Sequence, residues 1–129
     1  MIVSVLGIEG FDNLVEKAAK TAFSHANGTL GKVNILLTDD AEIQALNLKY
    51  RGIDKPTNVL SFDTGDIAIS LDTVKAEAPD MFDEHLAHMV VHGVLHLLGF
   101  DHIIDGDAEI MESLEAEILK EMNIENPYE

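Results

Sequence analysis

The sequence predicts an α+β domain in which a small mixed sheet of about four strands is covered by packed helices. Short β-branched segments alternate along the chain with longer segments whose apolar residues recur every three or four positions. One long segment, residues 80–98, is apolar on nearly every side, which indicates a helix buried against its neighbours. At 129 residues and 47% hydrophobic content, we expect residues 1–129 to form one domain.

The first half of the chain predicts two strands, each followed by a helix. Residues 2–6 are rich in β-branched side chains, and residues 11–26 carry an apolar stripe with helical spacing. Residues 33–38 form a second strand, apolar enough to be buried. The residues 39–42 that follow resemble a capping box, so we expect a helix to begin there and to continue to Arg51.

The second half predicts two short strands and three helices. The strands, 59–62 and 67–70, are joined by a hairpin-like connection and are expected to pair antiparallel. The helices are expected at about 71–78, 80–98 and 108–122. In the last of these, the side chains expected to face inward are Ile110, Met111, Leu114 and Ile118.

Composition and charge narrow the function classes. The formal net charge of −16 argues against nonspecific attraction to polyanions, so any nucleic-acid contact must be local. The chain has no cysteine, which excludes disulfides, thiolate metal sites and cysteine nucleophiles and leaves histidine and carboxylate ligands. The first residues lack a basic region and a long apolar run, so we expect a cytoplasmic protein that does not enter a membrane.

Three histidines in the segment 88–102 have the spacing of a metal site. His92 and His96 lie four residues apart, so on a helix both side chains project toward one point. Gly99 stands where a helix commonly ends in a left-handed residue, and the reversed chain can bring His102 back toward the pair. Three imidazoles could hold one Zn²⁺ and leave its fourth position for water, as in catalytic zinc sites.

The alternative is that these histidines are core residues that bind no metal. Two histidines four apart also arise by chance, but a third after a glycine turn, in a chain with six histidines, favours a metal. For His88, on the same stripe, we favour a supporting or core role over direct ligation, and we expect His85 to be solvated.

The histidine and glycine spacing matches the metzincin proteases, whose signature is H-E-x-x-H-x-x-G-x-x-H. Those enzymes need a glutamate immediately after the first histidine as general base, and here that position is Gly93. The sequence therefore argues against a protease that uses the usual mechanism.

A second resemblance extends over essentially the whole chain. It rests on four segments: residues 50–57 (YRGIDKPT), 59–62 (VLSF), 65–70 (GDIAIS) and 87–93 (AHMVVHG), the last running into the three histidines. In these segments the chain resembles the YbeY family of bacterial metal-dependent endoribonucleases. It departs from the family at Asn58, where Asp is usual, at Asp63, where Pro is common, and at Phe100, where Tyr is common. The segment 71–83 also looks short for the family.

The resemblance implies a zincin-like fold with one zinc ion on His92, His96 and His102. It implies cleavage of single-stranded RNA in maturation of the 3′ end of small-subunit ribosomal RNA and in ribosome quality control. The expected partners are therefore single-stranded RNA, ribosomal RNA and the small ribosomal subunit, with neither DNA nor a membrane among them.

Arg51, the only arginine, is the candidate for binding the phosphate. It lies where a helix is expected to end and a loop to begin, so it is either a surface charge or a bidentate phosphate ligand that stabilises the transition state. The resemblance and its solitary status favour the phosphate, and Lys55 is a weaker second candidate. We expect Arg51, His92, His96 and His102 to be catalytic. The general base stays open among His88, Asp101 and Asp66, and the 2′-hydroxyl of RNA could itself be the attacking group.

Two other functions remain compatible with the sequence. The chain could be a ribosome-associated RNA-binding factor in which the metal is structural, or a metal-dependent hydrolase of another phosphoester. A fourth protein ligand would favour the binding factor, whereas an open coordination position would favour the enzyme.

Overall fold

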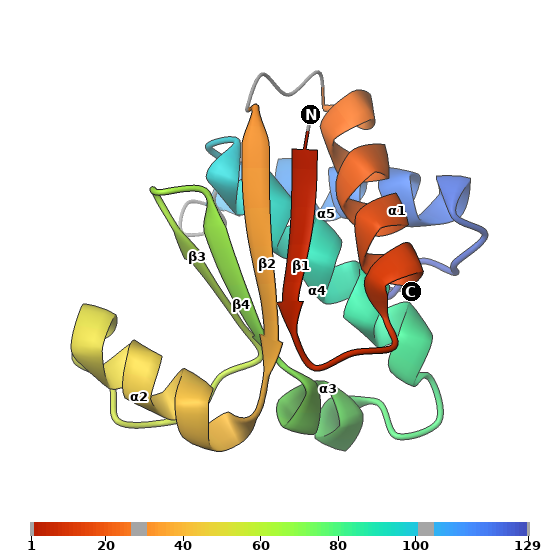
Figure 1. Ribbon diagram of the computed structural model, residues 1–129. Coiled ribbons are helices and arrows are strands. Elements are labelled where there is room, and N and C mark those ends of the chain that lie inside the picture. The colour runs from red at the N-terminus through yellow and green to blue at the C-terminus, as the bar shows by residue number, and fades with distance from the viewer. Residues whose placement is uncertain (1, 27–30, 101–104, 129) are drawn as a thin grey trace.

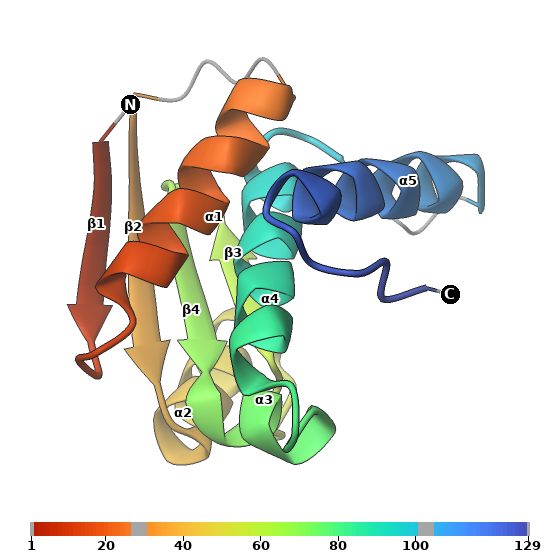
Figure 2. The ribbon, with the colours of Figure 1, turned by 90° about the vertical axis from the view of Figure 1, so that its right-hand side faces the viewer.

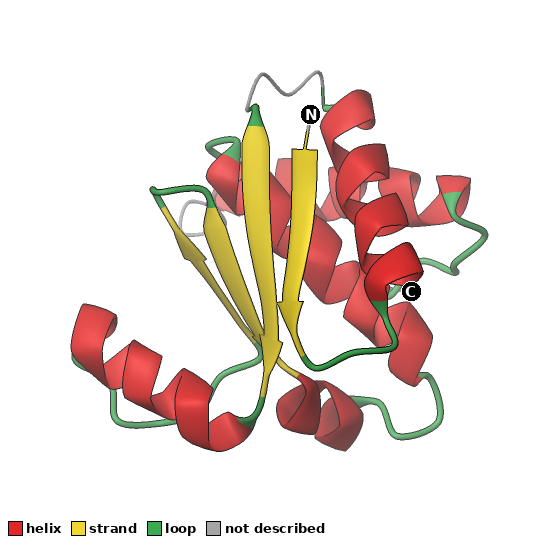
Figure 3. Ribbon diagram, in the orientation of Figure 1, coloured by secondary structure: helices red, strands yellow, loops and turns green. Residues whose placement is uncertain are grey.

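The computed structural model describes residues 2–26, 31–100 and 105–128. Within these ranges the chain forms a four-stranded sheet and five helices. The strands are β1 (Ile2–Gly7), β2 (Lys32–Thr38), β3 (Val59–Phe62) and β4 (Asp66–Ser70). The helices are α1 (Asp12–His25), α2 (Asp40–Arg51), α3 (Leu71–Glu77), α4 (Phe82–Leu97) and α5 (Asp105–Glu121). The predicted α+β class with a mixed sheet is confirmed (Figure 3).

The sheet has the strand order β1-β2-β4-β3 (Figure 1). The neighbours β1, β2 and β4 are parallel, with Val5 opposite Ile35 and Ile35 opposite Ile67. The edge strand β3 runs antiparallel to β4, as the short connection between them predicts. A parallel pair needs a crossover, and α1 and α2 supply the two crossovers of this sheet.

Helices cover the two faces of the sheet unequally. Helices α1 and α4 pack on one face, and α5 crosses on their far side (Figure 2). The inward side chains of β2, Val33, Ile35 and Leu37, are fully buried in the core beneath α1 and α4. On the opposite face, α2 packs a smaller cluster, whose buried members are Ile43, Leu60 and Ala68. This second face is therefore only partly covered.

Local hydrogen bonds set the ends of the helices that matter for the site. Asp39 Oδ1 accepts from Glu42 N at 2.9 Å, as the predicted cap requires. Helix α4 ends in a Schellman motif, in which Gly99 N donates to His96 O (3.1 Å) and Phe100 N donates to Leu95 O (3.0 Å). Gly99 has a φ of 98°, so the positive φ expected there is confirmed.

The inward face of α5 differs from the prediction at one apolar position. Ile110 is 54% exposed, so its expected place in the core is wrong, whereas Met111 and Ile118 are buried as expected. The buried stripe instead includes Glu115, four residues after Met111 and four before Leu119. Apolar periodicity cannot identify a buried charged residue. The inward face predicted from the apolar residues alone therefore included Ile110 and left out Glu115.

No helix in the described ranges is both long and apolar enough to cross a membrane.

Gly93 allows α4 to lie close to the sheet. A Cβ added at this position would meet Ile67 Cγ2 at 3.0 Å and Ser61 Oγ at 3.3 Å. Ser61 Oγ also donates to the carbonyl oxygen of Gly93 at 3.0 Å, which ties β3 to α4. A glutamate at position 93 would point into the sheet. Close packing between α4 and the sheet therefore explains why the glutamate of the metzincin signature is absent from this position.

Gly93→Ala should therefore destabilise the fold. The added methyl would meet Ile67 and Ser61 at 3.0–3.3 Å in a closely packed layer. We expect this overpacking, at about 1–3 kcal/mol, to exceed the gain of about 0.5–1 kcal/mol that alanine brings inside a helix. Urea unfolding measures the effect, with Gly31→Ala as control because a Cβ at Gly31 meets no atom within 4 Å. Equal stability of the two variants would show that the contact between α4 and the sheet is not tight.

Candidate metal and phosphate site

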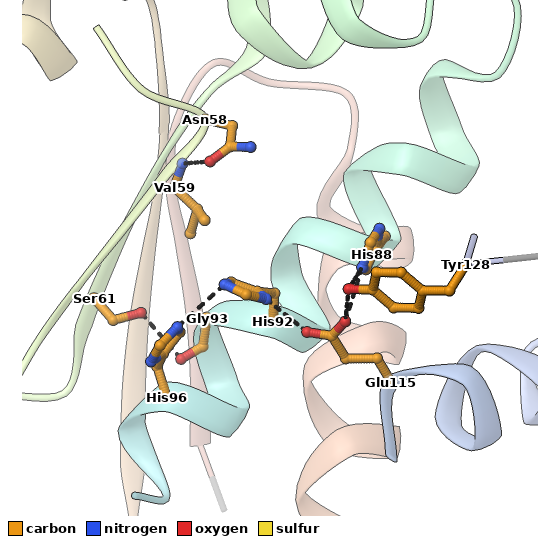
Figure 4. Close-up of polar contacts among 9 residues, drawn as sticks. All are labelled: Asn58, Val59, Ser61, His88, His92, Gly93, His96, Glu115 and Tyr128. Atoms are coloured by element: carbon orange, nitrogen blue, oxygen red, sulfur yellow. Dashed lines mark hydrogen bonds and ion pairs between the residues drawn. The ribbon is translucent and has the colours of Figure 1, made fainter. Parts of the chain in front are cut away.

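His92 and His96 converge on one point beside β3. Both project from α4, and their Nε2 atoms lie 3.1 Å apart (Figure 4). Two nitrogens bound to one tetrahedral metal at 2.0–2.1 Å would lie about 3.3 Å apart. The pair therefore has the separation needed for two ligands of a single ion.

The second ring nitrogen of His92 faces a carboxylate. Nδ1 of His92 lies 2.5 Å from Oε1 of Glu115, which comes from α5 (Figure 4). Because an ionised carboxylate only accepts, this contact assigns the ring proton to Nδ1. Metal-binding histidines in proteins commonly donate to a carboxylate in this way, which orients the ring and makes the other nitrogen the ligand.

Glu115 is a fully buried carboxylate that is surrounded by donors. Burial alone would raise its pKa, but hydrogen bonds with His88, His92 and Tyr128 outweigh burial and lower the pKa of Glu115 to about 2. Burial and the adjacent carboxylate raise the pKa of the Tyr128 hydroxyl, which donates to Glu115 Oε2. Glu115 is therefore held as an anion beside the histidine pair.

His88 lies behind this carboxylate and not beside the histidine pair. Its Nε2 is 3.0 Å from Glu115 Oε2 and 3.2 Å from the Tyr128 hydroxyl (Figure 4). The side chain is almost completely buried, which agrees with a supporting or core position. His85, expected to be solvated, is instead half-buried, and its Nε2 lies 2.9 Å from Glu77 Oε1.

A hollow of about 720 Å³ brings Arg51 to the histidine pair. Its lining includes Arg51 from the end of α2, Ser61 and Phe62 from β3, and His92 and His96 from α4. Arg51 and the two histidines, which are far apart in the sequence, thus face one space at the edge of the sheet. Among the described residues, no carboxylate lies within ion-pairing distance of Arg51.

The position of Arg51 depends on how α2 ends. Gly52 caps the helix with a φ of 71° and donates from its N–H to Leu48 O at 3.0 Å. The loop that follows is tied back to α2, because Asn47 Nδ2 donates to Lys55 O at 2.9 Å and Gln44 Nε2 donates to Asp54 Oδ1 at 2.9 Å. These bonds fix the loop at the rim of the hollow.

The other candidates from the sequence divide among several places. His102 and Asp101 lie outside the described residues. Among the residues that the structure describes, no three metal-ligating side chains form a group. Asp66 lines a neighbouring hollow and not the one that holds the histidines. Asn58 and Asp63, which depart from the family pattern, both line the histidine hollow.

Glu115 is the residue that the sequence argument missed. The sequence does contain a sign of its burial: Glu115 lies four residues after Met111 and four before Leu119, on the buried side of the helix. A carboxylate on an apolar face needs a polar partner, and the histidines of the preceding helix were the nearest candidates.

Comparisons with known proteins identify the family of this chain. A family model described as "Endoribonuclease YbeY" matches residues 5–123. A relative from Nitrobacter winogradskyi, named Endoribonuclease YbeY, is 44% identical over 92% of this chain and 74% of its own. A relative of the same name from Chelativorans sp. is 46% identical over 89% of this chain and 81% of its own.

A solved structure shares the fold. The solution structure of a Thermotoga maritima protein matches with a TM-score of 0.60 and 28% identity over 94% of this chain and 91% of that chain. The match to the family model and the identity to the relatives show that this chain belongs to the YbeY endoribonuclease family.

Proposed function

We propose that this chain is a zinc-dependent endoribonuclease that cuts single-stranded RNA. Its family and the names of its relatives support a hydrolase that acts on RNA. We further propose that the substrate is the 3′ end of small-subunit ribosomal RNA, that the enzyme serves ribosome maturation and quality control, and that it acts in the cytoplasm, where this substrate is found.

One observation carries the proposal: Arg51 faces the same hollow as a histidine pair whose Nε2 atoms are 3.1 Å apart. His92 and His96 would hold the metal, with His102 as the proposed third ligand. Imidazole donors without thiolates suit zinc among the common metals, although they also accept copper, iron or nickel. A zinc ion supplies a Lewis-acid charge that polarises a phosphate oxygen or a water molecule.

The protein residues position the substrate. The planar guanidinium of Arg51 can donate two parallel hydrogen bonds to a phosphate and stabilise the extra charge of the transition state. Glu115 holds the ring of His92 in one orientation and one tautomer through the contact of 2.5 Å. Neither His88, which contacts Glu115, nor Asp66, which lines the other hollow, is placed to take a proton beside the histidine pair.

The local charge suits an RNA substrate despite the acidic composition. Three of the eight basic residues, Lys49, Arg51 and Lys55, lie within seven positions at the end of α2 and in the loop after it. A phosphate chain can therefore approach the hollow along this segment. The favourable charge is concentrated where the proposed cleavage occurs.

His96→Ala should remove the metal while the protein stays folded. The substitution deletes one of the two nitrogens that converge at 3.1 Å. Metal content measured on purified protein should fall from one equivalent to a small fraction, and circular dichroism should remain unchanged. His85→Ala, on the same helix but paired with Glu77, is the control and should keep its metal. One retained equivalent of zinc in the His96 variant would contradict the ligand assignment.

Arg51→Ala should retain metal and fold but cleave RNA about a hundredfold more slowly. A charge-assisted contact to the transition state contributes on the order of 3 kcal/mol in a site with little other positive charge. Arg51→Lys should recover only part of the rate, because an ammonium cannot reproduce the two-donor fork. Cleavage of a single-stranded oligonucleotide measures the rates, and Lys120→Ala on α5 is the charge-matched control. An unchanged rate for Arg51→Ala would exclude the phosphate role.

A further inference from the structure

A second hollow adjoins the candidate site on the other side of the edge strand. Its volume is about 560 Å³, within the range of about 300–1,000 Å³ typical of small-molecule sites. Phe62 and Asp63, at the end of β3, line both this hollow and the one that holds the histidines. The two spaces therefore share a wall.

The walls of this second hollow are largely apolar. They include Leu36, Phe62 and Ala68 on the sheet face that α2 covers only in part, and Leu46 from α2 itself. Tyr50, from the last turn of α2, closes one side and is 57% exposed. Its ring packs edge-to-face against that of Phe62, with the centroids 5.2 Å apart and an interplanar angle of 66°.

Charge is distributed in a way that suits a nucleotide. Lys49 Nζ lies over the Tyr50 ring, 5.1 Å from its centre, and Arg51 lines the adjoining hollow, so two cations lie near the second hollow without lining it. Inside, the Asp66 carboxylate accepts from Asn34 Nδ2 (2.9 Å) and from Thr64 Oγ1 (2.5 Å). An acidic interior repels phosphate but accepts the N–H donors on the edge of a base.

We propose that the second hollow is a nucleobase subsite, in which Tyr50, supported by Phe62, stacks a base of single-stranded RNA next to the phosphate bound by Arg51. This inference rests on the proposed function, because it takes the histidine hollow as the place of cleavage. Bases of single-stranded RNA are commonly bound on aromatic side chains, with hydrogen bonds to the edge of the base. The shared wall at Phe62 lets one nucleotide place its base and its phosphate in adjoining spaces.

Binding of an RNA oligonucleotide tests the subsite without requiring cleavage. Fluorescence anisotropy in EDTA, with the full chain and a labelled single-stranded RNA, gives the Kd. Tyr50→Ala should weaken binding by roughly five- to a hundredfold, the range for one stacked base. Tyr50→Phe should bind within about twofold of the natural protein. Leu48→Ala is the matched control, since Leu48 is 49% exposed on the same helix and lines neither hollow.

A second RNA with one abasic residue makes the test specific for a base. The abasic position is moved along the oligonucleotide, and at one position the natural protein and Tyr50→Ala should bind equally well. If Tyr50→Ala binds intact RNA as tightly as the natural protein, or if its loss persists at every abasic position, the subsite is excluded.

The outcome for the subsite is separate from the outcome for the nuclease. Tyr50-dependent binding of a base by a protein that leaves RNA intact when zinc is added would retain the subsite and reject the proposed activity. Efficient cleavage together with an unchanged Kd for Tyr50→Ala would support the nuclease activity and reject the subsite.

Discussion

The contact between the buried Glu115 carboxylate and His92 Nδ1 is the interaction on which the site depends. It joins α5 to α4 at 2.5 Å and leaves His92 Nε2 directed toward His96. A buried carboxylate is costly unless donors surround it, and here His88, His92 and Tyr128 all contribute. The same contacts therefore stabilise the packing of α5 and set the orientation of a proposed metal ligand. A substitution of Glu115 should therefore affect both the packing of α5 and the orientation of the His92 ring.

Close approach between α4 and the sheet is the second constraint. Because Gly93 has no side chain, α4 can lie directly against Ile67 and Ser61. The close packing places His92 and His96 beside the edge strand β3. The antiparallel edge strand then separates two hollows, one with histidines and Arg51 and the other apolar with an acidic end. Because β3 is the edge strand, no further strand lies between the proposed phosphate and base sites.

Much of this arrangement could be predicted from the sequence. Hydrophobic periodicity located the helices and strands to within about three residues, and the spacing of His92 and His96 predicted their convergence. The order of the parallel strands could not be derived in this way, since it depends on long-range packing. Glu115 could not be identified from apolar periodicity, because a buried charged residue carries no apolar signal, and the inward position predicted for Ile110 was wrong. Arg51 and the histidine pair line one hollow but come from α2 and α4, and periodicity within one segment cannot predict that two distant segments meet. The predicted third ligand, His102, lies outside the described residues.

The tautomer of His92 is the most direct test of this account. In metal-free protein, nitrogen-15 NMR of the histidine rings distinguishes a proton on Nδ1 from one on Nε2. His92 should carry its proton on Nδ1, bound to Glu115, and Glu115→Gln should reduce this preference while Glu112→Gln on the same helix should not. A His92 ring protonated on Nε2 in the natural protein, or a tautomer indifferent to Glu115, would contradict the account.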